Sequence, residues 1–306
     1  MDHLFPERSA ESIAMSPQPA RAAWSLRRAA VILRATVLYG LLAVVAVIIV
    51  VPLWWVVASS FTTPETVWSN VLPFSWRAFW PQTFSLNAYR AIFAEGMGRA
   101  IWNTLVVSVA TVALTLIASA MAGFAFARFA FPGKQLLFWV VLLSFIVPGD
   151  ITIIPSYILV NNFGWLNSWQ GLIIPAVANS VVIFLFQQFF AEIPEALVDA
   201  ARVDGASWLR ILLQIILPLS RPVVVTASIL IFLSQWNNYF WPTLIAPDPD
   251  FRVIQVAIAQ LGHSQQLTLW DKIFAGSTIA ALIPILLTVP LQRYYVRSVM
   301  SAGIQG

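Results

Sequence analysis

Six long apolar stretches constrain the fold of this chain more than any other feature of its sequence. A membrane-spanning helix needs about 20 consecutive apolar residues. The stretches of that length are Ala35–Ser59, Ile101–Ala127, Gln135–Val160, Gly171–Phe190, Pro222–Ala246 and Ile273–Leu291. Charged residues make up only 10% of the chain, against about 25% in soluble domains. The sequence therefore predicts an all-α, polytopic membrane protein with six transmembrane helices.

Two of these stretches are interrupted by polar residues that we treat as candidates for a translocation path. Asp150 follows a Pro-Gly break in the third stretch, roughly 22 Å along a continuous helix of 1.5 Å per residue. An acid at that depth usually faces a cavity or a partner, although a water-exposed carboxylate at the outer boundary fits equally well. Asn237 and Asn238 interrupt the fifth stretch, where each side chain can bind solute hydroxyls or join two helices.

The distribution of basic residues predicts the orientation, because cytoplasmic segments of membrane proteins are enriched in Lys and Arg. With the N-terminus inside, the inner segments hold twelve of the 17 basic residues and the outer segments five. The inner ones are Arg8, Arg21, Arg27, Arg28, Arg34, Arg128, Lys134, Arg202, Arg210, Arg221, Arg293 and Arg297. The outer ones are Arg77, Arg90, Arg99, Arg252 and Lys272. Both termini are therefore expected in the cytoplasm, and the net charge of +4 reflects topology rather than nucleic-acid binding.

The positions of the spans also divide the chain. Residues 1–34 are polar and rich in Arg, and we expect a mobile, retained cytoplasmic tail. The apolar run that follows is too long for the core of a secretory signal, which has about 7–15 residues. Residues 35–298 form the predicted six-helix domain, with a cytoplasmic loop at 191–221, and residues 299–306 form a second cytoplasmic tail.

The sequence lacks the residues that disulfide bonds, metal sites, ATP binding and enzyme catalysis require. The chain has no Cys and only two His, so the sequence predicts neither a disulfide framework nor a His or Cys metal site. No G-x-x-x-x-G-K-[ST] loop is present to hold the phosphates of ATP. Neither paired carboxylates nor a nucleophile–base set is visible. We therefore expect a protein that is not an enzyme and binds no cofactor of its own.

Residues 194–222, PEALVDAARVDGASWLRILLQIILPLSRP, form a patterned polar segment between two apolar stretches. Pro194 suits a helix start, and Glu195 and Asp199 place negative charge in the first turns, where the helix dipole favours it. Asp204-Gly205 is a turn signal, after which a second helix leads back to the membrane. Such a helix suits docking in a cleft of another protein, or resting on the lipid surface as a connector.

This segment resembles the cytoplasmic loop signature of ABC importer permeases, which is Glu-Ala-Ala, three residues, Gly, nine residues, and Ile-x-Leu-Pro. Here Asp199-Ala200-Ala201 precedes Gly205 by the same spacing, and Ile215-Ile216-Leu217-Pro218 follows. Asp199 departs from the family's Glu, and Glu195 lies one turn earlier. The chain resembles the carbohydrate-type permeases in particular, and Ser85–Arg90, Asn103–Leu105, Gln235–Asn237, Trp241-Pro242 and Gln292–Val296 occur in the family's order.

The resemblance implies a permease of the bacterial inner membrane that forms half of a pore for a sugar or related polyol. Glycerol-3-phosphate or a glycerophosphodiester is the alternative solute. The implied partners are a second permease subunit, a dimer of ATPase subunits that binds the ATP, an extracytoplasmic solute-binding protein and membrane lipid. The implied ATPase-docking residues are Glu195, Asp199, Ala200, Ala201, Asp204, Gly205 and Ala206.

A stand-alone secondary transporter is the competing interpretation. An ion-coupled transporter would be expected to carry pairs of ionisable residues within its spans, whereas Asp150 stands alone there in the sequence. A membrane enzyme is a third interpretation, for which the sequence supplies no catalytic constellation.

Overall fold

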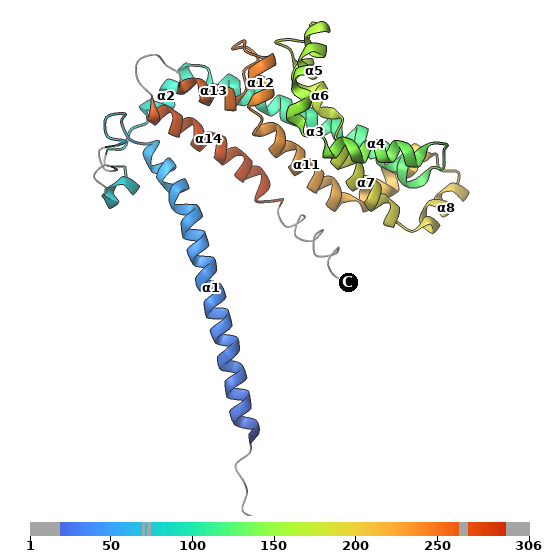
Figure 1. Ribbon diagram of the computed structural model, residues 1–306, viewed down its shortest axis with the longest axis horizontal. Coiled ribbons are helices and arrows are strands. Elements are labelled where there is room, and N and C mark those ends of the chain that lie inside the picture. The colour runs from blue at the N-terminus through green and yellow to red at the C-terminus, as the bar shows by residue number, and fades with distance from the viewer. Residues whose placement is uncertain (1–18, 69–70, 72–74, 82, 263–268, 292–306) are drawn as a thin grey trace, which may run out of the picture. The chain divides into compact units, whose positions relative to one another are not determined.

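The structure is a computed structural model that describes residues 19–68, 71, 75–81, 83–262 and 269–291. Every regular element in that part of the chain is a helix (Figure 1). This confirms the prediction of an all-α protein. Residues up to Trp54 form one unit, and the residues from Trp55 onwards form a second unit, which contains the sites described below.

The long helix α1 (Pro19–Ser59) begins earlier than the first predicted span. Residues 19–34, which we predicted to belong to the N-terminal tail, are therefore helical and continuous with the first span. This region is rich in Ala, Leu and Arg, which are strong helix formers, and Pro19 occupies the first helical position, where its missing N–H costs nothing. Within α1, residues Val31–Ser59 are long and apolar enough to cross a membrane.

Two other single helices are also long and apolar enough to cross, namely α3 (Met97–Arg128) and α14 (Trp270–Thr288). Three bent pairs extend the number of candidate spans in the described residues from three to six, if each pair counts as one span. The pairs are α4 (Lys134–Ile146) with α5 (Gly149–Asn162), α6 (Trp169–Val177) with α7 (Ser180–Glu192), and Trp208–Leu219 with α11 (Arg221–Trp236).

The break at Pro148-Gly149 is sharper than the sequence indicated. The axes of α4 and α5 differ by 106°, so the depth of about 22 Å for Asp150, which assumed one continuous helix, is wrong. Pro148 has no N–H to continue the hydrogen bonding of α4, and it precedes the first residue of α5. The predicted break at Asn237-Asn238 is present, because α11 ends at Trp236 and α12 (Phe240–Ile245) begins three residues after Asn237.

Helix α3 is the centre of the second unit and packs most extensively against α7, then against α11 and α6 (Figure 1). Its buried face consists largely of small and hydroxyl residues, including Ser108, Thr111, Thr115, Ser119 and Gly123. A Cβ atom on Gly123 would lie 2.7 Å from the Cβ atom of Phe186 on α7. The two helices are therefore closer than any larger residue would allow, as is common in membrane helix pairs.

Short helices connect these elements. On the side predicted to face outward they are η1 (Trp76–Phe79), α2 (Asn87–Ala94), α12 and α13 (Ile254–Leu261). On the opposite side they are α8 (Glu195–Val203), α9 (Trp208–Ile211), the π-helical turn η2 (Leu212–Ile216) and α10 (Leu217–Leu219). The predicted polar segment is therefore a helix, a turn and a second helix that bends by 83° into α11.

Candidate functional site

Residues 193–211, which we name the coupling turn, comprise the entry to α8, the two helices α8 and α9 and the bend between them, and backbone hydrogen bonds close that bend. The N–H groups of Asp204, Gly205 and Ala206 donate to the carbonyls of Ala200, Arg202 and Ala201. Gly205 has φ = +78°, in the left-handed region, and the turn expected from Asp204-Gly205 is present. No atom beyond the adjacent residues lies within 4 Å of where its Cβ would be. Glycine is therefore favoured here by backbone conformation and not by crowding.

The inner face of the coupling turn is fixed to the helix core. Val198 and Ala206 are buried in a cluster that includes Phe186 and Phe190 of α7. The indole ring of Trp208 meets Phe129 edge to face, with ring centroids 5.0 Å apart. A set of apolar contacts thus attaches both helices of the turn, and their packing is a stronger constraint than the intrinsic stability of such short helices.

Two arginines complete this attachment, and neither was identified as a site residue from the sequence. The guanidinium of Arg202 lies 4.7 Å from the ring centroid of Trp208 and donates to the carbonyl of Ala206 at 3.0 Å. Arg128, at the last turn of α3, donates through Nη2 to the carbonyls of Phe190 and Ile193. The only signal for Arg128 in the sequence is its place at the end of an apolar span, which also fits an ordinary topology determinant.

The outer face of the coupling turn is exposed and acidic. Glu195 and Asp199 are one helical turn apart on α8, and Asp204 caps its end; all three are exposed. Within the part of the chain that the structure describes, no Lys or Arg makes an ion pair with any of them. Exposed apolar groups lie beside the acids, because Val203 is 88% exposed and Leu197 47%. This surface is suited to a partner with basic and apolar groups.

The docking residues expected from the sequence do not all share this face. Ala200 and Gly205 are exposed with the acids, but Ala201 is half-buried against the core cluster and Ala206 is buried in it. The small size of Ala201 and Ala206 therefore serves the packing of the turn on its own chain. The sequence motif could not distinguish residues that dock on a partner from residues that pack on the chain's own core. Which alanines face the core depends on the bend at Gly205.

The residues proposed for a translocation path are only partly described. The side chain of Asp150 lies outside the described residues. Asn237 is exposed at the end of α11 and donates its amide to the carbonyl of Leu233 at 2.9 Å, so its nearest partner is its own helix. Asn238, half-buried, lines a cavity together with residues of α5 and α6.

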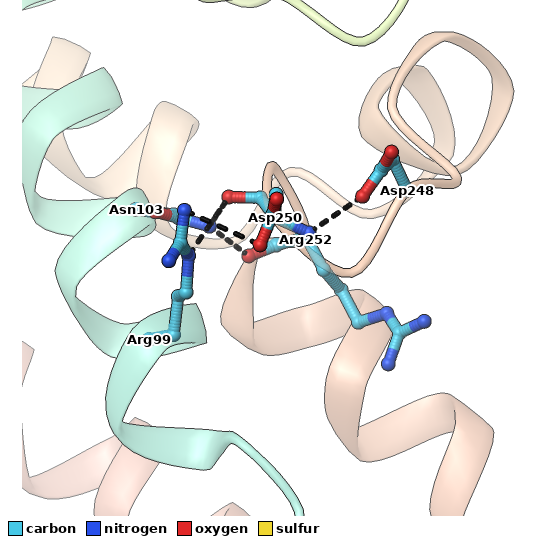
Figure 2. Close-up of polar contacts among 5 residues, drawn as sticks. All are labelled: Arg99, Asn103, Asp248, Asp250 and Arg252. Carbon is cyan, nitrogen blue, oxygen red and sulfur yellow. Dashed lines mark hydrogen bonds and ion pairs between the residues drawn. The ribbon is translucent and has the colours of Figure 1, made fainter.

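At the other end of α3, the loop of residues 247–253, which we name the α13 loop, is held by side chains of α3 (Figure 2). Asn103, only 1% exposed, donates its amide to the carbonyls of Asp250 and Arg252 at 2.9 Å each. Arg99 pairs with Asp250 at 3.3 Å. The hydroxyl of Thr104 accepts from the N–H of Ile254 at 2.8 Å. This loop is therefore held rigidly against the first turns of α3.

Comparison with known proteins identifies the family to which this chain belongs. Residues 115–301 match the family described as binding-protein-dependent transport system inner membrane component, which covers more than half of the chain. The chain belongs to this family, so it is a multi-pass permease subunit of an ABC importer in a bacterial inner membrane. The family is one of transport subunits and not of enzymes.

Individual relatives indicate which type of permease this chain resembles. The sn-glycerol-3-phosphate transport system permease protein UgpE of Brucella melitensis is 30% identical over 210 residues, which are 68% of this chain and 74% of the relative. UgpE of Salmonella typhi is 29% identical over 239 residues, 78% of this chain and 79% of the relative. These relatives and the family match make the chain similar to the carbohydrate-type permeases, as the sequence motifs predicted.

A solved structure supports the same fold. The fold of this chain is similar to that in the crystal structure of a bacterial ABC transporter involved in the import of the acidic polysaccharide alginate. The TM-score is 0.73 at 19% identity, and the match covers 92% of this chain and 99% of the other. The overall fold of this chain is therefore one already seen in a chain of a bacterial ABC transporter.

Proposed function

We propose that this chain forms half of a solute pathway with a second permease subunit and transmits the motion of a separate ATPase dimer through the coupling turn. The observation that carries the proposal is the two-sided character of the turn. Its inner face is fixed to α3 and α7 by apolar contacts and by Arg128. Its outer face presents Glu195, Asp199 and Asp204 without an ion-pair partner among the described residues. A rigidly attached acidic surface fits a basic cleft on the ATPase.

The solute we propose is a sugar or related polyol, delivered by an extracytoplasmic binding protein. Glycerol-3-phosphate, or a glycerophosphodiester, is the alternative, because the relatives at about 30% identity are named as sn-glycerol-3-phosphate permeases. We also propose that the α13 loop, held on α3 by Asn103, forms part of the surface that the binding protein meets.

The topology that goes with this proposal has six spans, with both termini and the coupling turn in the cytoplasm. Each of the three bent pairs then counts as one crossing. The native chain has no Cys, so single cysteines report directly on the side of the membrane. Glu65 and Val203 are exposed positions in the described residues. A membrane-impermeant thiol reagent on intact cells should label Glu65→Cys and leave Val203→Cys unlabelled. The reverse pattern would invert the orientation.

The coupling role is tested by recovery of the ATPase with a tagged permease. Because an exposed charge pair contributes only about 0–1 kcal/mol, Asp199→Ala alone should weaken recovery slightly. Glu195→Ala combined with Asp199→Ala should reduce recovery and uptake together, because no carboxylate then remains on α8. Asp199→Glu is the matched control, and it should behave as the unaltered protein does. Full recovery and full uptake in the double variant would contradict docking and favour a connector that lies on the lipid surface.

Asp150 retains its proposed place on the translocation path because of its position beside the Pro-Gly break at the start of α5. Asp150→Ala should lower uptake while leaving recovery of the ATPase and its basal hydrolysis unchanged. Unchanged uptake would favour a water-exposed carboxylate with no role in transport. Of the two asparagines we keep Asn238 on the proposed path, and we assign Asn237, whose amide donates to the carbonyl of Leu233, to the packing of its own helix end.

A further inference from the structure

A small cavity lies where α5 and α6 meet the turn that connects α11 to α12. It has a volume of about 170 Å³ and is lined by Thr152, Ile153, Ser156, Pro175, Ala176, Asn238 and Trp241. Pockets for drug-sized ligands have volumes of about 300–1,000 Å³. This cavity can therefore hold one sugar ring, or a group the size of glycerol, rather than a whole oligosaccharide.

The polar groups in the lining are hydroxyls and an amide, and they converge from two elements. Thr152 and Ser156 are four residues apart on α5, so they lie on one face of that helix. The Thr152 hydroxyl donates to the carbonyl of Gly149 at 2.7 Å, which leaves its oxygen free to accept. Among the described side chains, neither the Ser156 hydroxyl nor the Asn238 amide makes a hydrogen bond. These groups can donate to and accept from a ligand that carries several hydroxyls.

An oriented aromatic ring forms another part of the lining. The indole N–H of Trp241 donates to the carbonyl of Gly171 on α6 at 3.0 Å, and this bond fixes the ring. The face of an indole carries negative charge density, which attracts the C–H groups of a sugar or polyol because their carbons bear electron-withdrawing hydroxyls. An indole ring beside hydroxyl and amide groups is a combination suited to a polyhydroxylated ligand.

The charge of the cavity lining favours a neutral solute over a phosphorylated one. All seven lining residues are described, and none of them is Lys, Arg or His. A phosphate would therefore enter without the cationic partner that such groups usually have in proteins. Asp150, two residues before Thr152 in the chain, can add only negative charge.

We infer that this cavity binds one ring or one glycerol-sized part of a neutral, polyhydroxylated solute within this permease subunit. Asn238, Ser156 and Thr152 bind the hydroxyls, and Trp241 contacts the C–H face. The inference rests on the proposed function, since it assigns a solute class to the proposed pathway. It selects the neutral sugar or polyol over the glycerol phosphate that the names of the relatives indicate.

The test uses the importer complex purified through the tagged permease and reconstituted in nanodiscs without binding protein. The probes are glycerol, glucose, maltose and sn-glycerol-3-phosphate, each titrated by saturation-transfer difference NMR. At least one neutral probe should bind more tightly than sn-glycerol-3-phosphate. Because a single hydrogen bond contributes about 0.5–1.5 kcal/mol, Asn238→Ala should lower that affinity about 2- to 12-fold.

Asn237→Ala is the matched control, because it removes the same side chain one position earlier, outside the cavity lining. It should change the affinity less than about 2-fold. Trp241→Phe keeps a ring but removes the bond to Gly171, and it provides a second variant if Asn238→Ala does not fold. Loss of affinity in Trp241→Phe, with Asn237→Ala unchanged, supports the site.

Three outcomes would overturn the inference. They are binding of sn-glycerol-3-phosphate at least as tightly as the neutral probes, the absence of binding by all three neutral probes, and equal affinities in the Asn237 and Asn238 variants. These outcomes are distinct from failure of the proposed function. If the ATPase does not purify with the unaltered permease, the coupling proposal fails whatever the probes do.

Discussion

The two ends of α3 hold loops in the same way but leave them with different surfaces. At one end Asn103 donates to the carbonyls of Asp250 and Arg252, and at the other end Arg128 donates to those of Phe190 and Ile193. About 38 Å of helix separates the two donors at 1.5 Å per residue. In each case one side chain of α3 satisfies two backbone acceptors of a distant segment, so a long helix serves as the common support for both loops.

The difference lies in the acids that these loops carry. In the α13 loop, Asp250 is paired with Arg99, and the carboxylate of Asp248 accepts from the N–H of Asp250. In the coupling turn, Glu195, Asp199 and Asp204 have no ion-pair partner among the described residues. Each of these two acids of the α13 loop thus has a partner within the chain, whereas the acids of the coupling turn are left for another protein. We infer that the α13 loop is built for rigidity and the coupling turn for docking.

The largest effect is expected for Arg128→Ala, which removes the support of the coupling turn. Hydrogen bonds to a charged group contribute about 1.5–3 kcal/mol each, and both carbonyls lose their donor. Recovery of the ATPase and uptake should fall close to background, while the permease remains inserted in the membrane. Arg128→Lys should be intermediate, because an ammonium does not reproduce the planar fork of Arg. Normal ATPase recovery in Arg128→Ala would show that the apolar contacts alone hold the turn.

Asn103→Ala tests the opposite end of α3, where Asn103 holds the α13 loop. The two bonds are neutral and part-buried, and leaving such acceptors unsatisfied costs up to about 1–3 kcal/mol. The midpoint of thermal unfolding of the purified permease should fall, and proteolysis in the α13 loop should become faster. Recovery of the ATPase should stay near that of the unaltered protein, in contrast to Arg128→Ala. Asn87→Ala, at an exposed position of α2, is the control and should leave the midpoint unchanged.

A smaller effect is expected for Gly205→Ala at the bend of the coupling turn. A left-handed conformation costs a residue with a Cβ about 1–2 kcal/mol, and Gly205 has open space around it. The variant should therefore insert and fold but recover less ATPase than the unaltered protein. Gly205→Asn should be closer to normal, since Asn visits this conformation more readily. If Ala and Asn reduce recovery equally, backbone strain is not the cause.

The smallest effect is expected for Arg99→Ala. The side chains of Arg99 and Asp250 are 60% and 66% exposed, and exposed pairs contribute about 0–1 kcal/mol. The thermal midpoint should fall only slightly, and added salt should reduce the difference further because it screens the pair. A fall as large as that of Asn103→Ala would mean that the ion pair, and not the buried amide, holds the α13 loop.

The elements of the fold differ in how well the sequence could predict them. The apolar stretches located the helices of the bundle, because the length of an apolar run sets whether it can cross a membrane. The breaks at Pro148-Gly149 and at Asn237-Asn238 were visible from residue type. The angle between α4 and α5 and the early start of α1 at Pro19 were not, since local residue preferences give neither a bend angle nor a boundary beyond the apolar run.

The candidate sites, like the fold, have some features that the sequence predicts and others that it does not. The spacing from Asp199 to Gly205 and on to Leu217-Pro218 predicted a helix, a bend and a second helix, because charge at a helix start and Gly at φ > 0 are local requirements. The amino-acid sequence by itself thus determined an all-helical membrane protein with an acidic polar turn. Only the tertiary structure decided that Arg128 and Asn103 hold the two loops, that Ala201 and Ala206 face inward, and that Asn238 lies beside Thr152 and Ser156 in a cavity. The physical reason is that these contacts join residues far apart in the chain, and their geometry depends on how the helices pack.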